Sequence, residues 1–131
     1  MASPIIDKAG NKAWRNSKRQ LHRKNGPAYE SADGYKQWNQ NGQVHRIDGP
    51  AKECPNGYKA WYINGKLHRE DGPAKEYTDG VKFWYQNGLL HREDGPAVEN
   101  DINDKFWCKN GLTDEFIDSN KTWFINGKRI E

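Results

Sequence analysis

The sequence carries a motif that recurs every 23 residues. In one register, this interval separates four histidines, four tryptophans and four Gly-Pro pairs: His22, His45, His68 and His91; Trp38, Trp61, Trp84 and Trp107; and Gly-Pro at 26–27, 49–50, 72–73 and 95–96. Such a fixed period predicts a chain built from one supersecondary unit, whose copies are stabilised by packing against their neighbours. The first copy is irregular, since Trp14 precedes His22 by eight residues where later copies use seven.

The apolar residues of this chain are aromatic rather than aliphatic. Leu, Ile, Val and Phe make up only 20 of the 131 residues, or about 15%. Disorder is suspected when this fraction falls below roughly 20%. Six Trp, six Tyr and four Phe supply large apolar surfaces instead, and the formal net charge is only +3. Disordered chains are poor in aromatic residues. We therefore expect a folded chain with a thin, distributed core.

Each copy is predicted to form a β-hairpin. In the clearest copy, residues 59–63 have the aromatic and β-branched character of a strand. Asn64-Gly65 follows as a two-residue turn, which requires a positive φ at both positions. Residues 66–69 then form the return strand. The same Asn-Gly turn appears in the neighbouring copies at 41–42, 87–88 and 110–111.

The turn fixes which residues face each other across the hairpin. A two-residue turn at 64–65 places Trp61 opposite His68. The Asp-Gly-Pro sequence beyond it ends the ladder, because proline has no N–H group to donate. Residues 74–77 then form a short extended piece, closed by a second turn at Asp79-Gly80.

These elements predict an all-β protein, an elongated single-sheet array of about six β-hairpin repeats with a 23-residue period. We expect residues 1–11 to be an N-terminal leader and residues 12–131 to be the repeat domain. Residues 121–131 are expected to be a truncated last copy that caps the array. A β-helix with one 23-residue coil per rung is the alternative topology, but the Asn-Gly turns favour hairpins.

Residues 61–68 read Trp-Tyr-Ile-Asn-Gly-Lys-Leu-His, Asp79-Gly80 follows, and both have counterparts one period away, from Lys12 to Lys128. This pattern resembles the MORN family of β-hairpin repeats. It is most similar to the variant, antitoxin-like copies that occur in bacteria, phages and large DNA viruses. Here, however, His68 leads into Arg-Glu-Asp-Gly-Pro-Ala rather than Gly-x-Gly. The resemblance implies a non-catalytic module for protein assembly or inhibition, encoded by a phage or virus.

The repeated polar residues are not expected to bind a metal or to catalyse a reaction. In a hairpin array, equivalent histidines lie two strands or roughly 10 Å apart, whereas zinc ligands all lie about 2 Å from one ion. We expect each His to pack on the Trp opposite it and to bond the following turn. Asp48, Asp71 and Asp94 have near-identical surroundings, so they lack the unequal environments of an acid–base pair. We predict no enzymatic activity, no cofactor and no metal.

The two cysteines and the first residues of the chain indicate the cellular compartment in which we expect the protein. Cys54 and Cys108 occupy different repeat positions, two periods or more apart, so we expect two free thiols and a reducing environment. The first residues contain no apolar signal core, and no stretch approaches the roughly 18 apolar residues of a membrane helix. We therefore expect a cytoplasmic protein, in the host cytoplasm if it is viral, without integral membrane association.

A lysine stands two residues before each tryptophan, so Lys and Trp share one face of each predicted strand. The lysine stems either cover the Trp rings or form a stripe that binds an acidic partner. The arginine after each His is a second candidate edge, because its planar fork pairs with carboxylates. The predicted binding residues are Lys36, Lys59, Lys82, Lys105, Trp61, Trp84, Arg46, Arg69 and Arg92.

Together, these features predict a non-catalytic protein that binds a macromolecular partner through one long face, as an inhibitor or neutraliser. The expected partner is another protein with an acidic surface. Two alternatives remain: a binder that sequesters an anionic, nucleotide-like ligand, and a module for nucleic acid or a membrane surface. Nucleic acid is the weaker of these partners, because 18 acidic residues nearly balance 21 basic ones.

Overall fold

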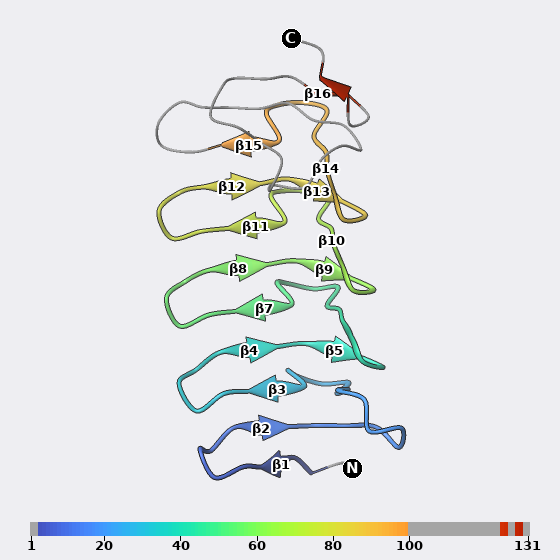
Figure 1. Ribbon diagram of the computed structural model, residues 1–131, viewed down its shortest axis with the longest axis vertical. Helices are drawn as coiled ribbons and strands as arrows, with labels where there is room; N and C mark the ends of the chain where they lie inside the picture. The colour runs from blue at the N-terminus through green and yellow to red at the C-terminus, as the bar shows by residue number, and fades with distance from the viewer. Residues whose placement is uncertain (1–2, 100–123, 126–127, 130–131) are drawn as a thin grey trace. The chain divides into compact units, whose positions relative to one another are not determined.

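The computed structural model describes residues 3–99, 124–125 and 128–129. These residues form β-strands, turns and loops and contain no helix, which confirms the all-β repeat architecture (Figure 1). The chain divides into two compact units, Met1–Lys66 and Leu67–Glu131. Each unit contains the same kinds of hairpin, and they are described separately below.

The first unit contains an antiparallel sheet of very short strands. Its order is β1 (Ile5–Ile6), β2 (Lys12–Ala13), β3 (Tyr29–Glu30), β4 (Lys36–Gln37), β7 (Lys52–Glu53) and β8 (Lys59–Ala60). A separate two-stranded ladder joins β5 (Asn39–Gln40) to β6 (Gln43–Val44). The strand β9 (Tyr62–Ile63) follows β8, and β10 (Lys66–Leu67) lies at the boundary of the two units.

The second unit repeats this arrangement. Its sheet contains β11 (Lys75–Glu76), β12 (Lys82–Phe83) and β15 (Val98–Glu99), again antiparallel. A separate ladder pairs β13 (Tyr85–Gln86) with β14 (Leu89–Leu90), and another pairs β16 (Phe124–Ile125) with β17 (Lys128–Arg129).

The structure differs from the prediction in which hairpins make the continuous sheet. The sequence suggested that the Asn-Gly hairpins stand side by side in one sheet. Instead, the longer sheet of each unit is formed by the strands on either side of the Asp-Gly turns, a name used here for the turns at 7–10, 33–34 and 79–80 and for the equivalent Asn56-Gly57. Each Asn-Gly hairpin, with its turn at 41–42, 64–65 or 87–88, is a separate ladder. In Figure 1 the Asp-Gly turns lie at the left edge of the ribbon and the Asn-Gly turns at the right.

The backbone of the repeated tryptophan explains this division. The N–H of Trp38 donates to the carbonyl of Ala51 (2.8 Å), which belongs to the sheet side of the next copy. Its carbonyl accepts a hydrogen bond from the N–H of His45 (3.0 Å), which belongs to the Asn-Gly hairpin. The chain therefore changes partners at Trp38, and a segment predicted as one strand becomes two.

The turns have the geometry that their residues predict. Asn41 and Gly42 have φ values of 48° and 85°, and the equivalent turns at 64–65 and 87–88 match them. Asn39 pairs with Val44, which is the predicted register for a two-residue turn. The predicted pairing of Trp with His is also present, because the N–H of His45 bonds the carbonyl of Trp38.

The Asp-Gly turns are stabilised by carboxylates that accept local hydrogen bonds. Asp7 accepts the side-chain amide of Asn11 (3.0 Å) and the N–H groups of Asn11 and Ala9, and these bonds lower the pKa of its carboxyl group. The hydroxyl of Ser31 donates to Asp33 in the next such turn and lowers the pKa of that carboxyl group in the same way. In contrast, burial raises the pKa of Tyr35 to about 12.

The start of the chain belongs to the sheet. The segment 1–11, expected as a leader, contributes β1, which pairs with β2 in the register Ile5 to Ala13. The extra residue of the first copy is accommodated in a longer turn between Asn16 and Gln20, where Arg19 adopts a φ of 65°. The N–H of His22 still bonds the carbonyl of Trp14, so the insertion leaves the repeat register intact.

The core is thin because the strands are short. In the first unit the fully buried apolar side chains are those of small alanines, Ala28, Ala51 and Ala60. The second unit has a larger cluster, formed by Ala74, Tyr85, Leu90, Ala97 and Val98. The alanine that follows each Gly-Pro pair is therefore a buried position, where a larger side chain has no room.

We expect Ala51→Leu to destabilise the protein by about 1–3 kcal/mol, because the added methyl groups overfill a site with no exposed surface. The free energy of unfolding from urea titration measures this. The matched control is Ala32→Leu, the same change at an exposed turn residue. Equal losses at both positions would contradict the burial argument.

Candidate binding surface

In three of the copies, an arginine stacks on the repeated tryptophan. We number the copies by their equivalent arginines, Arg23, Arg46, Arg69 and Arg92, and call the arginine with its tryptophan the Arg–Trp cluster. The guanidinium carbon lies 3.9 Å from the ring centroid in three of them: Arg23 over Trp14, Arg46 over Trp38 and Arg92 over Trp84. The flat guanidinium is well suited to stack on an indole ring.

The same guanidinium is held by hydrogen bonds within its own copy. In the second copy, Nε of Arg46 donates to Asp48 (3.0 Å), while Nη1 donates to the carbonyl of Pro50 (3.0 Å) and to Glu53 (3.3 Å). Arg69 and Arg92 repeat these contacts, with Nε to aspartate at 3.2 Å in both copies. The predicted binding arginines therefore pair with carboxylates of their own chain.

The glycine of each Gly-Pro pair makes room for this arrangement. A Cβ added at Gly49 would lie 3.0 Å from Cζ of Arg46, and the distances at Gly72 and Gly95 would be 2.8 Å and 2.5 Å. The arginine thus lies between a tryptophan ring and a glycine backbone. The sequence repeats glycine here because of this close approach.

The repeated histidines link consecutive copies. Nδ1 of His45 accepts a hydrogen bond from the backbone N–H of Asn64 (2.9 Å), which opens the turn of the next copy. His22 and His68 bond Asn41 and Asn87 in the same way, each at 3.0 Å. Because Nδ1 is the acceptor, a neutral ring carries its proton on Nε2. The sequence placed the imidazole on the tryptophan face, but the arginine occupies that face.

The predicted lysine stripe alternates with glutamates. In the first unit, the cross-strand partners run Lys12, Glu30, Lys36, Glu53 and Lys59. In the second unit, Lys82 lies between Glu76 and Glu99. Directly opposed residues lie on one face of a sheet. This Lys/Glu row therefore has little net charge, a property that no single strand reveals. Lys105 lies outside the described residues.

Two lysines outside the stripe cover aromatic rings. The ammonium of Lys52 lies 5.0 Å from the ring centroid of Tyr62, and that of Lys75 lies 5.5 Å from Tyr85 and 5.6 Å from Phe83. Neither lysine is among the binding residues predicted from the sequence. The available signal was their position, since both follow a Gly-Pro-Ala segment at the 23-residue interval.

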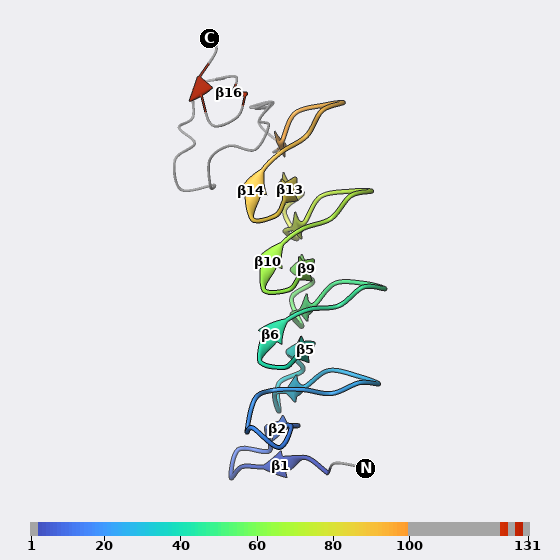
Figure 2. The same ribbon diagram turned by 90° about the vertical axis from the view of Figure 1, so that its right-hand side faces the viewer.

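A groove lies between successive loops in each unit. In the first unit it is lined by Trp38, Gln40 and His45 together with the loops at 23–26 and 46–48, and it has a volume of about 900 Å³. In the second unit, Trp84, Gln86 and His91 occupy the equivalent positions, and the volume is about 530 Å³. Figure 2 shows the loops after β6 and β14 projecting from the sheet.

The two grooves share their floor but differ in their walls. The walls of the first groove carry Lys24 and Ile47, and Ile47 is 83% exposed. The corresponding positions of the second groove are Glu70 and Glu93, next to Asp71 and Asp94. These loop-tip residues are not among the binding residues predicted from the sequence, because they are the positions at which the repeat is least regular.

The remaining predicted groups are found where the repeat places them. Trp61 lies half-buried between β8 and β9, and Cys54 is a free thiol, while Cys108 lies outside the described residues. Within residues 3–99 and the two short C-terminal strands, no three His, Cys, Asp or Glu side chains are grouped for a metal ion. The same residues include no helix of the length and apolar character needed to cross a bilayer.

No protein-family model, curated protein or solved structure matches this chain. The resemblance to MORN repeats therefore stays a prediction from the sequence.

We expect Arg46→Lys to destabilise the protein by about 2 kcal/mol. A lysine cannot stack flat on Trp38, and its single nitrogen cannot replace both Nε, which bonds Asp48, and Nη1, which bonds Glu53. Urea denaturation measures the loss. Lys36→Arg, a change between the same residue types at an exposed position, is the control and should alter stability by less than about 0.5 kcal/mol.

We expect His45→Leu to lower the free energy of unfolding by about 1 kcal/mol, because the hydrogen-bond acceptor of the Asn64 amide is lost. Hydrogen exchange at that amide should become faster for the same reason. His45→Asn is the matched variant, since its Oδ1 occupies the place of Nδ1 and keeps an acceptor there. Amide exchange measured by NMR distinguishes the two. If both variants exchange equally fast, the hydrogen bond does not hold the turn.

Proposed function

We propose that this chain is a non-catalytic repeat protein whose loop tips bind another protein, as an inhibitor or neutraliser in the cytoplasm. The observation that carries the proposal is the recurrence of one groove, with a constant floor and variable walls, in both units. The inhibitor role rests on the resemblance to antitoxin-like repeats.

The division between constant and variable residues supports a binding role. The constant residues, such as Trp38, Arg46 and Gly49, are held by contacts within the chain. The variable residues at the loop tips, such as Ile47 and Glu70, point to solvent. On a surface of this kind, substitutions at the loop tips can change the binding specificity while the framework residues stay the same.

The loop tips are a better candidate surface than the Lys/Glu row. In the row, each lysine faces a glutamate, so the long-range attraction for an acidic partner largely cancels. At the tips, an exposed isoleucine offers apolar area and the carboxylates are solvated: Asp48, Asp71 and Asp94 are 86%, 89% and 90% exposed. Apolar side chains flanked by charges are typical of protein interfaces.

The loops also define the chemistry of the partner. The first groove presents Lys24 beside Ile47 and would attract an acidic, partly apolar patch. The second groove presents Glu70, Asp71, Glu93 and Asp94 and would attract a basic patch. The proposed partner therefore carries charges of both signs, and an acidic surface is expected only where it meets the first groove.

The repeated grooves support a non-catalytic assignment. Acid–base chemistry requires titratable groups with unequal environments. The aspartates of the second, third and fourth copies instead share one environment, each bonded to Nε of its arginine. A fixed ion pair is suited to structure rather than to proton transfer.

The experiment is capture of partners from lysate by the wild-type chain and by loop variants. We expect one protein at near-equal stoichiometry. Ile47→Asp should weaken binding about tenfold or more, since an exposed apolar contact is replaced by a charge, without changing stability. Binding should also weaken at high salt, because exposed charges are screened over about 8–10 Å.

The matched controls are Lys36→Glu and Lys59→Glu in the Lys/Glu row. Both should leave the affinity for the captured protein unchanged. If these variants lose binding while Ile47→Asp retains it, the row is the interface and the loop proposal is wrong. If no protein is captured at stoichiometric amounts from any relevant lysate, the binding function itself is contradicted.

A further inference from the structure

The first copy differs from the others at the carboxylate that its arginine should bind. In the second, third and fourth copies, an aspartate two residues after the arginine accepts from Nε at 3.0–3.2 Å. In the first copy this position is Asn25. Among the described residues, no hydrogen-bond acceptor occupies Nε of Arg23.

Two other contacts of the first cluster are retained. The guanidinium of Arg23 stacks on Trp14 at the same 3.9 Å, and its Nη1 donates to the carbonyl of Pro27 (3.2 Å), as in the other copies. Glu30 lies 3.9 Å from Nη1, farther than the glutamates of the other copies. The arginine is thus held in a binding geometry, but the oxygen that its Nε binds elsewhere is absent.

A second carboxylate is also replaced in this loop. In the third copy, Glu70 lies 3.7 Å from Nε2 of His68, and the first copy has Lys24 at the position of Glu70. The loop at 23–26 therefore carries a positive charge where the loop at 69–72 carries two negative ones. The net charge of the loop at 23–26 is therefore three units more positive than that of the loop at 69–72.

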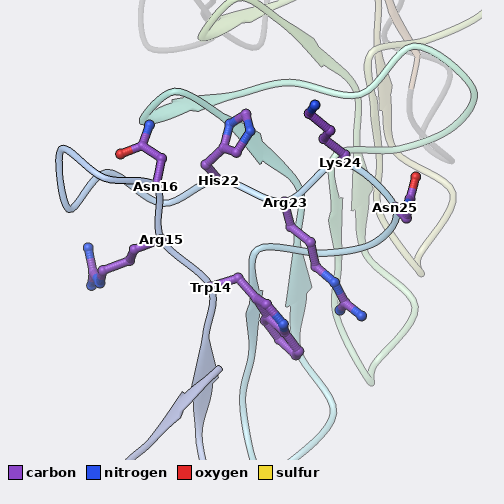
Figure 3. Close-up of a pocket in the computed structure, with 7 residues that line it drawn as sticks. All are labelled: Trp14, Arg15, Asn16, His22, Arg23, Lys24 and Asn25. Atoms are coloured by element: carbon purple, nitrogen blue, oxygen red, sulfur yellow. The ribbon is translucent and has the colours of Figure 1, made fainter. Parts of the chain in front are cut away.

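These residues line a cavity of about 350 Å³ (Figure 3). Its lining includes the cations Arg15, Arg23 and Lys24 and contains no carboxylate. In Figure 3 the guanidinium of Arg23 lies beside the Trp14 ring, while Asn25 and Lys24 point away from it. Lys24 is exposed and has a flexible stem, so it adds positive charge near the opening.

We infer that the first copy binds a phosphate group at Nε of Arg23, in the place that an aspartate oxygen takes in the other copies. A phosphate carries about 1.5–2 negative charges, which suits a site that has lost two carboxylates and gained a lysine, better than one carboxylate would. Arginine also donates to phosphate oxygens in the geometry that it uses for carboxylates. The phosphate is either free or part of a small ester. The inference does not rest on the protein partner proposed above, although Arg23, Lys24 and Asn25 line both this cavity and the first groove.

The test is an NMR titration of the full-length protein with inorganic phosphate, following the arginine Nε–Hε signals at constant ionic strength. We expect the Arg23 signal to shift saturably, while those of Arg46, Arg69 and Arg92 stay fixed because aspartates already occupy them. Sodium chloride alone should produce no saturable shift. Adenosine monophosphate is the second probe, and tighter binding than phosphate would identify an ester as the source.

Two single changes test the assignment in opposite directions. Asn25→Asp restores the internal carboxylate, so it should weaken phosphate binding about tenfold or more without lowering the melting temperature. Asp48→Asn removes a carboxylate from the second copy and should make the Arg46 signal responsive to phosphate.

Three results would overturn the inference. The first is the absence of a saturable shift at Arg23 in the wild type. The second is unchanged binding in Asn25→Asp. The third is saturation by glutamate at the same concentration as phosphate, which would make this a carboxylate site.

Discussion

The stacking of an arginine on a tryptophan, which occurs in the first, second and fourth copies, is the contact on which the packing of these copies depends. The guanidinium of Arg46 contacts Trp38 on one face and leaves no room for a side chain at Gly49 on the other. Its nitrogen atoms bond an aspartate of the loop and a glutamate of the sheet. The side chain of Arg46 therefore connects the loop, the sheet and the tryptophan ring. With strands of only two residues, such a junction replaces much of the apolar core that a larger domain would contain.

The repeat period, the all-β class and the turn conformations were predictable from the sequence. The Asn-Gly pairs define their own backbone geometry, and positive φ at Asn41 and Gly42 follows from local sterics. The partner of each strand was not predictable in this way. Trp38 uses its N–H in one ladder and its carbonyl in another, and no local preference of the residue encodes that division. Pairing between copies depends on how the chain returns after each Gly-Pro pair.

The candidate site was partly predictable, for a related reason. Reading along one strand identifies Lys36 and Trp38 as neighbours on a face, but the glutamate opposite Lys36 comes from another copy. The charge of a sheet face is a property of its register, which a single strand does not contain. The arginines, in contrast, find their aspartates two residues away, so that ion pair was accessible from sequence. The residues that are the same in every copy stabilise the fold. Ile47 and Lys24 differ from their equivalents in the other copies, and both line the first groove, where a ligand can reach them.

The histidine contact gives the chain a direction. Among the described residues, Nδ1 of His22, His45 and His68 bonds the turn of the copy that follows, as His22 does with Asn41. A segment of 23 residues thus carries the acceptor for the next copy and the donor for the previous one. Duplication or loss of a whole segment re-forms the same joint at the new junction, because it keeps the 19-residue separation between each histidine and the asparagine that it bonds. The gene for such a chain can gain or lose loop grooves in single steps, and the framework itself defines the size of the step.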